Sequence, residues 1–202
     1  LRNKVPKEAI MVIALLQNAG HEAFLVGGCV RDLIMGISPK DYDVTTTATP
    51  EEIIALFPKT FYENTYGTVG VVTCGEENLP VCSDETVKIV EVTPYRLETT
   101  YSDNRHPDEV MWSKNIEDDL KRRDFTCNAI AYNPVTGEMV DPFGGQLDIK
   151  DKVIRAVGQP DQRFNEDALR LMRGIRLMSQ LDFDLHPVTR ESIERNAHLL
   201  NN

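Results

Sequence analysis

The sequence lacks several features that would place it in a membrane or outside the cell. No apolar run approaches the ~18 residues of a membrane-spanning helix, and the N-terminus shows no signal-peptide pattern. The cysteines form no C-x-x-C pair, and the histidines show no metal-ligand spacing relative to them, which argues against a zinc site. We therefore expect a cytoplasmic globular protein with no membrane partner and with reduced thiols at its four cysteines, Cys29, Cys74, Cys82 and Cys127.

Positive charge is also scarce. The chain of 202 residues has 22 lysines and arginines against 32 aspartates and glutamates, which gives a formal net charge of −10. Proteins that bind nucleic acid usually carry a basic patch, so the total charge argues against a broad RNA-binding surface. Several arginines are clustered, however, at 122–123 and within 163–176. Any contact with nucleic acid is therefore expected to be local and strongly dependent on salt.

The pattern of apolar residues divides the chain into two parts. The first part mixes helical and strand patterns, and from Asp161 onward only helical periodicity remains. Thr49 and Pro50 form a typical helix start, and we expect a mobile loop over 97–112 and a long hairpin loop over 75–85. The sequence thus predicts an α+β part at 1–158 and an all-helical part at 159–202. The principal elements expected are helices at 6–19, 29–35 and 115–121, and strands at 22–26, 42–45, 68–73, 87–94 and 153–157.

The helical pattern after Asp161 predicts an apolar face and an arginine-rich face. At about 100° per residue, the apolar positions fall on one arc and most charged positions fall on the opposite half. The residues expected on the apolar arc are Ala168, Leu171, Met172, Ile175 and Met178.

Asp41 and Asp43 are the strongest candidates for a metal site. They follow the stretch LVGGCVRDLIMGISPK, and alternate strand residues point to the same face, so the two carboxylates can share a site. Mg²⁺ is the usual cation between such carboxylates, especially when substrate phosphates complete its coordination. The Gly-Gly turn presents backbone N–H groups at a helix start, where a triphosphate can bind. A lone D-x-D is more often a solvated surface turn, but the preceding G-G-x-V-R-D favours the metal site.

Two nearby charged residues each have two interpretations. Two-metal phosphoryl transfer usually needs a third carboxylate, and Glu91 is the best candidate because it lies in the apolar strand Lys88–Val92. Its side chain either joins the two aspartates or points to solvent, and alternation cannot separate these cases. Arg31 either binds phosphate or pairs with Asp32 or Asp43.

A second set of candidates lies in the arginine clusters. Arg123 and Asp124 place a fork-shaped donor beside an acceptor, which suits a ribose and its phosphate but is equally common as a surface ion pair. Arg173 and Arg176 can reach triphosphate oxygens, because arginine is suited to bidentate phosphate contact. The alternative for these two is a solvated basic helix face.

Asp167 and Arg170 form the most specific pattern after Asp41 and Asp43. On one helix these two residues would be neighbours, and the simple interpretation is a surface salt bridge. The pair also places an acceptor beside a donor. Asp167 could accept from the exocyclic amine of cytosine or adenine while Arg170 donates to the adjacent ring nitrogen. Uracil and guanine carry the reverse pattern and would leave a buried charge unpaired, so the pair could accept CTP and ATP and reject UTP and GTP.

The sequence resembles the class II tRNA nucleotidyltransferases, the bacterial CCA-adding enzymes, which share a superfamily with bacterial poly(A) polymerases. The resemblance runs from about residue 5 to about residue 200, and its motifs appear in the family's order. These are LVGGCVRD with DYDVTTTATP, EVTPYR, YSDNRHPDEV, KRRDFTCNAIAYNP, DPFGGQLDIKDKVIRAVG and FNEDALRLMRGIRLMSQLDF.

The resemblance implies a fold and a set of residue roles. It implies a nucleotidyltransferase-fold head, with a mixed sheet and flanking helices, at 1–158. A shortened helical neck that templates the nucleotide follows at 159–202, and the family's body and tail domains are missing from this chain. By resemblance, Asp41 and Asp43 hold Mg²⁺, and the nucleotide is bound by Gly28, Arg31, Arg123, Asp124, Asp167, Arg170, Arg173 and Arg176.

The activity implied is template-independent addition of C, C and A to the 3′ end of tRNA, with CTP and ATP as substrates and pyrophosphate as product. Enzymes that add only A or only CC, and poly(A) polymerases, share much of this motif set and remain alternatives. A fragment that binds CTP or ATP without turnover is the second alternative.

Overall fold

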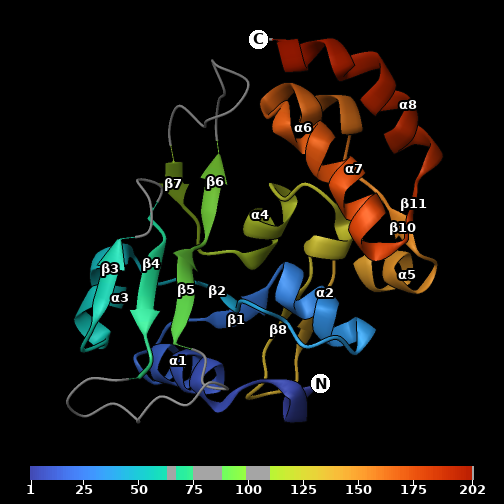
Figure 1. Ribbon diagram of the computed structural model, residues 1–202. Coiled ribbons are helices and arrows are strands. Elements are labelled where there is room, and N and C mark those ends of the chain that lie inside the picture. Colours follow the sequence, from blue (N-terminus) through green and yellow to red (C-terminus); the bar gives the residue numbers. More distant parts are fainter. Residues whose placement is uncertain (63–66, 75–87, 99–109, 202) are drawn as a thin grey trace. The chain divides into compact units, whose positions relative to one another are not determined.

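The computed structural model describes residues 1–62, 67–74, 88–98 and 110–201 (Figure 1). The 75–85 stretch and most of the 97–112 loop expected from the sequence lie outside these ranges. The chain divides into two compact units. Unit 1 comprises residues 1–95, 112–116 and 131–140, and unit 2 comprises 96–111, 117–130 and 141–202. Unit 2 therefore draws on three separate stretches of sequence and includes residues well before position 159.

Unit 1 is built on one mixed sheet. Among the described residues, its strand order is β3-β4-β5-β2-β1-β8-β9, with β2 and β5 parallel and the other neighbours antiparallel (Figure 1). With its flanking helices this makes the α+β architecture that the sequence predicts. The strands are β1 (Ala23–Val26), β2 (Asp43–Thr46), β3 (Thr60–Tyr62), β4 (Val69–Val72), β5 (Ile89–Pro94), β8 (Ala131–Tyr132) and β9 (Met139–Val140).

The two faces of this sheet differ in character. The register aligns Val44, Val92 and Val69 across three strands, and all three are buried. Helices α1 (Lys7–Asn18) and α3 (Pro50–Leu56) contact these strands and each other, and they supply buried apolar side chains such as Val12 and Ile53. The strand residues between the valines therefore point to the opposite face, which is where Asp43 and Glu91 lie.

Local sequence explains how α3 begins. The Thr49 hydroxyl accepts from the Glu52 backbone N–H at 3.4 Å, and the Glu52 carboxylate accepts from the Thr49 N–H at 2.8 Å. This reciprocal capping box, with Pro50 in the first turn, confirms the helix start predicted from the sequence. The backbone hydrogen bond from Thr49 also holds the pKa of Glu52 below its usual value. The other helices of unit 1 are the 3₁₀ turn η1 (Arg2–Lys4) and α2 (Gly28–Met35).

Unit 2 is mostly helical but not entirely so. Val153 pairs with Asp184 and Ile154 pairs with Leu185 in a short parallel ladder, so a two-residue strand interrupts the region after 159. Another short pair, β6 (Arg96–Glu98) and β7 (Val110–Trp112), forms its own two-stranded sheet. The remaining elements of this region are α4 (Ile116–Lys121), η2 (Thr126–Asn128), α5 (Gly145–Lys150), β10 (Val153–Ile154), α6 (Pro160–Glu166), α7 (Leu169–Leu181), β11 (Asp184–Leu185), α8 (Pro187–Asn196) and η3 (Ala197–Asn201).

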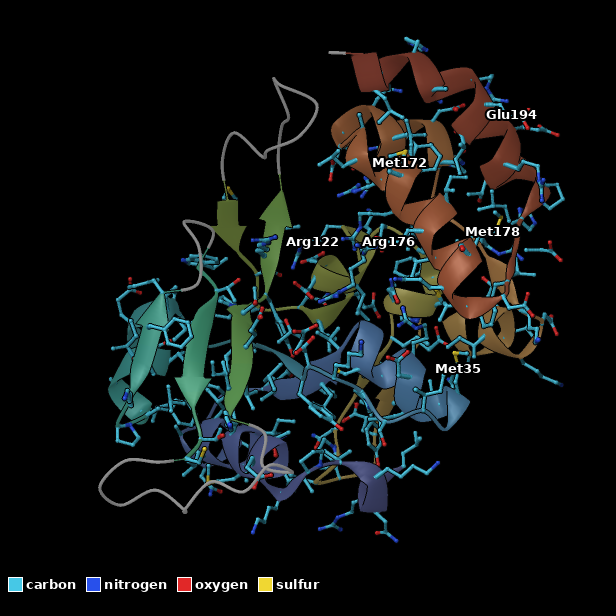
Figure 2. All side chains as sticks on the ribbon, in the orientation of Figure 1. Met35, Arg122, Met172, Arg176, Met178 and Glu194 are labelled. Carbon is cyan, nitrogen blue, oxygen red and sulfur yellow. The ribbon has the colours of Figure 1, made fainter. Side chains whose placement is uncertain are left out.

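The apolar face predicted for α7 is wrong at two positions. Met172 is 55% exposed and Ile175 is 39% exposed, whereas Gly174 is buried. A Cβ at Gly174 would lie 3.0 Å from the Phe125 ring, so the helix packs closely on Phe125 through this glycine. The Arg170 side chain points inward because it binds Glu166 and two backbone carbonyls. The buried face of α7 therefore includes Arg170 and Gly174 and excludes Met172 and Ile175. Figure 2 shows the side chains of α7, with Met172 and Met178 labelled.

Two further findings concern the features that the sequence lacks. No helix among the described residues is long and apolar enough to cross a membrane. Cys29 and Cys127 are buried and form no disulfide, but Cys74 is disulfide-bonded. The expectation of reduced thiols at all four cysteines is therefore wrong at Cys74, because scattered spacing in a sequence does not report which cysteines meet in the fold.

Candidate functional site

The central feature of unit 1 is a pair of carboxylates on neighbouring parallel strands. Asp43 begins β2, and its direct partner in the register is Glu91 of β5. The Glu91 backbone N–H donates to the Tyr42 carbonyl at 3.2 Å, which fixes this alignment. Register partners share a face of the sheet, so Glu91 lies on the same side as Asp43. The interpretation in which Glu91 joins the aspartates fits this placement, and its catalytic role remains a prediction.

Asp41 lies just before β2, in a bend, and is exposed. Tyr42 is 4% exposed, and burial, with a smaller contribution from Cys29, raises its pKa. An inward Tyr42 between two outward aspartates is the alternation expected from the sequence. The buried Tyr42 ring therefore fixes the backbone between Asp41 and Asp43.

The described residues contain no group of three or more His, Cys, Asp or Glu side chains that could hold a metal ion. Asp41, Asp43 and Glu91 are therefore not gathered into a three-carboxylate metal site in this structure, and a cation at Asp41 and Asp43 would take most of its ligands from water and substrate. Such an open set suits Mg²⁺, which usually keeps water and substrate phosphates among its ligands.

The helix start next to these carboxylates is built by two glycines. Gly27 has φ 81°, a left-handed conformation that glycine adopts without steric cost, and α2 begins at Gly28. The Cys29 thiol donates to the Val26 carbonyl at 3.3 Å and to the Asp43 carbonyl at 3.8 Å. These contacts fasten the first turn of α2 to the start of β2, so the backbone N–H groups of this turn lie beside Asp43.

Arg31 has a structural partner and also lies over the start of α2. Its Nε and Nη2 donate to Asp32 Oδ1 at 2.9 and 2.7 Å, which confirms the Asp32 pairing considered from the sequence. Its guanidinium also lies 3.7 Å from where a Cβ at Gly28 would stand. The arginine therefore curls back over the helix start, where a phosphate would find both the guanidinium and the backbone N–H groups.

Gly28→Ala tests whether this turn binds phosphate, because the variant should leave the fold of the turn unchanged. The added methyl meets only ordinary van der Waals contacts, at 3.7 and 3.9 Å from the Arg31 guanidinium. Alanine is the better helix former by about 1 kcal/mol, so we expect an unfolding temperature equal to or above that of the wild type. If a phosphate approaches this backbone, the methyl should weaken CTP binding in calorimetric titration about tenfold. Unchanged CTP affinity would remove Gly28 from the site.

In unit 2, Asp124 and Arg173 form a close ion pair. Arg173 Nε donates to Asp124 Oδ2 at 2.6 Å, and Asp124 Oδ1 accepts from the Phe125 N–H at 2.8 Å. The Asp124 carboxylate raises the pKa of Arg173, and Asp167 adds to this effect. The segment around Asp124 is held by hydrogen bonds between Thr126 and Arg155 and between Val157 and Asp124. Asp124, which is predicted to lie near the ribose, and Arg173, which is predicted to bind phosphate, are therefore hydrogen-bonded to each other.

Asp119 is a central residue that sequence reasoning missed. It is fully buried, and its two carboxylate oxygens accept from Arg122 at 2.6 and 3.0 Å and from Arg123 at 3.1 Å. The spacing Asp119-x-x-Arg122-Arg123 on a helix is the signal that could have found it. Arg123 Nε is buried and, among the described residues, has no hydrogen-bond partner. Asp119 thus fixes the arginine that the family resemblance assigns to the nucleotide.

The predicted helical pair of Asp167 and Arg170 is not present. Helix α6 ends at Glu166, Asp167 is extended with φ −143° and ψ 105°, and α7 begins at Leu169. Asp167 Oδ1 accepts from the Leu169 N–H at 2.9 Å, which forms a local turn just before α7. The assumption of one continuous helix is wrong because the chain breaks at this aspartate.

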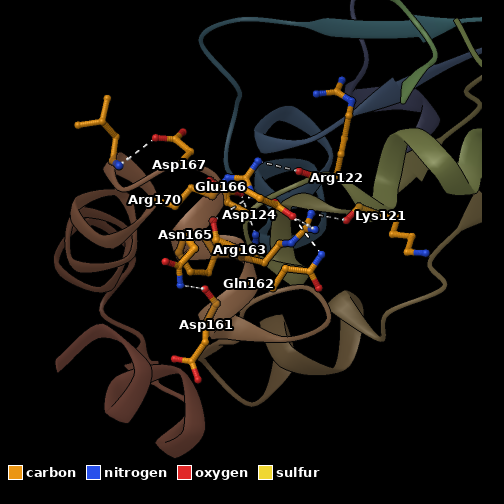
Figure 3. Close-up of polar contacts among 12 residues, drawn as sticks. Lys121, Arg122, Asp124, Asp161, Gln162, Arg163, Asn165, Glu166, Asp167 and Arg170 are labelled. Carbon is orange, nitrogen blue, oxygen red and sulfur yellow. Dashed lines mark hydrogen bonds and ion pairs between the residues drawn. The ribbon is translucent and has the colours of Figure 1, made fainter. Parts of the chain in front are cut away.

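Arg170 instead binds inside unit 2 (Figure 3). Its Nη1 donates to Glu166 Oε2 at 2.8 Å and to the Arg163 carbonyl at 3.3 Å, and its Nη2 donates to the Arg122 carbonyl at 3.1 Å. Its side chain is 9% exposed. Arg176, by contrast, lies exposed on α7 (Figure 2). The residues predicted to read the base are thus close in sequence but have separate partners in this structure.

Comparison with known proteins identifies the family of this chain. Residues 23–155 match the family described as the poly A polymerase head domain. The CCA-adding enzyme of Geobacillus stearothermophilus is 44% identical over 195 residues, which cover 96% of this chain and 45% of that protein. The CCA-adding enzyme of Anoxybacillus flavithermus is 43% identical over 199 residues, or 98% of this chain and 47% of that protein. The chain thus spans about half the length of these relatives.

Solved structures of CCA-adding enzymes and of a tRNA nucleotidyltransferase are also similar to this chain. The Bacillus stearothermophilus CCA-adding enzyme in complex with CTP has a TM-score of 0.82 at 41% identity, over 96% of this chain and 44% of that one. A tRNA nucleotidyltransferase complexed with a primer tRNA and an incoming ATP analog has a TM-score of 0.71 at 27% identity, over 94% and 50% of the two chains. The chain belongs to the family of the poly A polymerase head domain, in the branch whose relatives are the CCA-adding tRNA nucleotidyltransferases.

Proposed function

We propose that this chain is the catalytic and nucleotide-reading part of an enzyme that adds C, C and A to the 3′ end of tRNA. The observation that carries the proposal is the alignment of Asp43 with Glu91, beside the Gly27–Gly28 helix start. It is the pairing of carboxylates and backbone N–H groups that a nucleoside triphosphate with Mg²⁺ requires. One related structure is a complex with CTP, and another is a tRNA nucleotidyltransferase complexed with a primer tRNA and an incoming ATP analog, which supports this substrate class.

In the proposed reaction, the 3′-hydroxyl of tRNA attacks the α-phosphate of CTP or ATP, and pyrophosphate leaves. Asp41 and Asp43 would hold Mg²⁺, which lowers the pKa of the attacking hydroxyl and neutralises charge on the phosphates. The start of α2 and Arg31 bind the triphosphate, and Arg173 and Arg176 supply further cationic contacts. These contacts position the α-phosphate, and much of phosphoryl-transfer catalysis comes from such positioning.

The two units divide the proposed work. Unit 1 supplies the carboxylates and the phosphate-binding turn, and unit 2 supplies the neck function that selects the base. Within unit 2, we propose that residues 159–202 form the helical neck, with Asp167 and Arg170 choosing CTP or ATP. Arg170 would exchange its hydrogen bond to Glu166 or to a carbonyl for one to the base. Soluble cytoplasmic localisation is part of the same proposal, because the substrates are cytoplasmic.

Extension of a tRNA that ends before CCA, with each nucleotide supplied separately, tests the proposal. CTP alone should be incorporated, ATP should be added after the two cytidines, and UTP and GTP should not be used. Incorporation of ATP alone without any use of CTP would favour an A-adding enzyme or a poly(A) polymerase. Binding of CTP or ATP in calorimetric titration without any extension would favour a fragment that binds nucleotides without turnover.

Asp167→Ser is expected to weaken base selection without unfolding unit 2. The serine hydroxyl can still form the local turn with the Leu169 N–H, so the unfolding temperature should stay close to that of the wild type. Its hydroxyl is too short to reach a base and carries no charge. Loss of one hydrogen bond to a charged group costs about 1.5–3 kcal/mol, so the preference for CTP over UTP should fall about ten- to a hundredfold. Unchanged exclusion of UTP and GTP would show that Asp167 does not read the base.

A further inference from the structure

One row of residues crosses the polar face of the unit 1 sheet. The register pairs Phe61 of β3 with Gly70 of β4, Gly70 with Glu91 of β5, and Glu91 with Asp43 of β2. Direct partners in a ladder share a face, so these four residues lie on the same side. The row therefore runs from an aromatic ring at the edge strand to the candidate metal site.

The Phe61 ring leans along this row. Its tip and the two adjoining carbons lie 2.4–2.7 Å from where a Cβ at Gly70 would stand. The ring thus fills the space left by the missing side chain of residue 70 and extends from β3 over β4. Phe61 is nevertheless 40% exposed. Neighbouring strands are about 4.8 Å apart, so the ring tip is one strand from Glu91 and two strands from Asp43.

The next row on the same face extends this apolar surface. Val72 pairs with Ile89, and Ile89 is 46% exposed. The Lys59 carbonyl accepts from the Val72 N–H at 3.1 Å, so this exposed lysine lies at the end of that row. Phe61, Val72 and Ile89 form an aromatic shelf with carboxylates along one side and a cationic residue at the other.

A purely structural explanation exists for Phe61. An aromatic ring laid over a glycine in a neighbouring strand stabilises an antiparallel sheet. Stabilising the sheet does not require the exposed apolar surface of Phe61 and Ile89 beside Glu91. An exposed aromatic ring with apolar neighbours and a nearby cation is the composition that binds unpaired nucleobases.

We propose that the aromatic shelf binds the base of the 3′-terminal nucleotide of the RNA, stacked on Phe61. The inference rests on the proposed function, because the 3′-hydroxyl of that nucleotide must lie at Asp43 and its base lies one ribose away. The terminal base changes after each addition, so its binding site must tolerate different bases. Stacking does so, because every base has a π-face. The net charge of −10 argues against a broad basic surface for RNA, which increases the weight of stacking.

Binding of RNA to Phe61 variants tests the shelf directly. The probe is a fluorescent tRNA that stops before CCA and lacks its terminal 3′-hydroxyl, measured by anisotropy. Phe61→Ala should bind this RNA about tenfold more weakly, in line with the loss of one stacked base. Tyr62→Ala is the matched control, because Tyr62 is a 56% exposed aromatic in the same strand whose side chain points to the opposite face. It should bind like the wild type.

A second RNA and two further variants separate stacking from sheet stability. Wild-type protein should lose about the same affinity for an RNA whose terminal nucleotide is abasic, and Phe61→Ala should lose nothing more with it. Phe61→Leu should restore the unfolding temperature without restoring binding. Gly70→Ala keeps the ring but displaces it, because a Cβ there would clash with it, and should also weaken RNA binding.

The results that would overturn the shelf are equally specific. Equal affinity of wild type and Phe61→Ala for the RNA would do so, as would equal affinity of the wild type for normal and abasic ends. A raised KM for CTP with unchanged RNA affinity would assign the shelf to the incoming nucleotide instead. If the wild type binds RNA through Phe61 but extends nothing, the shelf stands and the proposed reaction fails.

Discussion

Replacing Asp43 by asparagine is expected to lower the rate of nucleotide incorporation about a thousandfold. The change keeps the size of the side chain but removes a charged ligand next to Glu91. Charge stabilisation by a bound divalent cation is worth several kcal/mol in the transition state, and each 1.36 kcal/mol is a factor of ten in rate. The rate of single-turnover CMP addition to a tRNA lacking CCA measures the effect.

Asp182→Asn is the matched control for this variant. Asp182 has a fully exposed side chain and φ 55° at the end of α7, a left-handed conformation that asparagine also adopts. The chemical change is identical, so incorporation should remain at the wild-type rate. The unfolding temperature of Asp43→Asn should also stay near that of the wild type. Activity within tenfold of the wild type at saturating Mg²⁺ would rule out Asp43 as a metal ligand.

Asp119→Asn is expected to cause the largest loss of stability in unit 2. Asp119 is fully buried, and the side chains of its partners Arg122 and Arg123 are only 15% and 19% exposed. Removing one member of a buried ion pair leaves the others without compensation and costs about 3–5 kcal/mol. Because the arginines are not completely buried, we expect about 3 kcal/mol in the free energy of unfolding from urea titration. Glu194→Gln on α8, an exposed carboxylate (Figure 2), should change this free energy by less than about 0.5 kcal/mol.

The lowered pKa of Asp119 predicts that the free energy of unfolding depends on pH. Burial acts to raise the pKa of Asp119, but the charges and hydrogen bonds of Arg122 and Arg123 outweigh it and lower the pKa below its ordinary value. The unfolded value is about 3.9. A lowered pKa in the folded state means that the stabilisation is present above pH ~4 and is lost as pH falls through the folded pKa. The difference in unfolding free energy between wild type and Asp119→Asn should therefore shrink below pH 4.

Asp119→Asn also tests whether Asp119 positions a nucleotide contact. Arg123 would lose the carboxylate that holds its Nη2. At a urea concentration and temperature where both proteins are folded, the variant should have a higher KM for CTP and little change in the Mg²⁺ dependence of the rate. A KM equal to that of the wild type would restrict Asp119 to a structural role.

Local patterns predicted unit 1 well. The capping box of α3, the positions of the main strands and the alternation of Asp41, Tyr42 and Asp43 all depend on residues close in sequence. The partnership of Asp43 and Glu91 could be suggested but not decided, because it depends on which strands become neighbours. That information is carried by the register of β2 and β5, which no local pattern reports.

Unit 2 was harder to predict for a physical reason. The periodicity of polar and apolar residues continues across Asp167, but the backbone there is extended and two helices meet. The side chain of Arg170 is drawn to Glu166 and to carbonyls of Arg163 and Arg122. Such acceptors are supplied by tertiary structure, so a helical wheel assigns Arg170 to solvent and Met172 to the core, whereas the structure has the reverse.

The 3′ sequence of the RNA product shows whether this chain adds C, C and A. A tRNA that ends before CCA is incubated with the protein, Mg²⁺ and all four nucleoside triphosphates, and the ends are then sequenced. We expect each extended molecule to end in C, C and A and to grow no further, and we expect no extension when Mg²⁺ is chelated. A tail of adenosines, an end of A alone or CC alone, or incorporated U or G would contradict it.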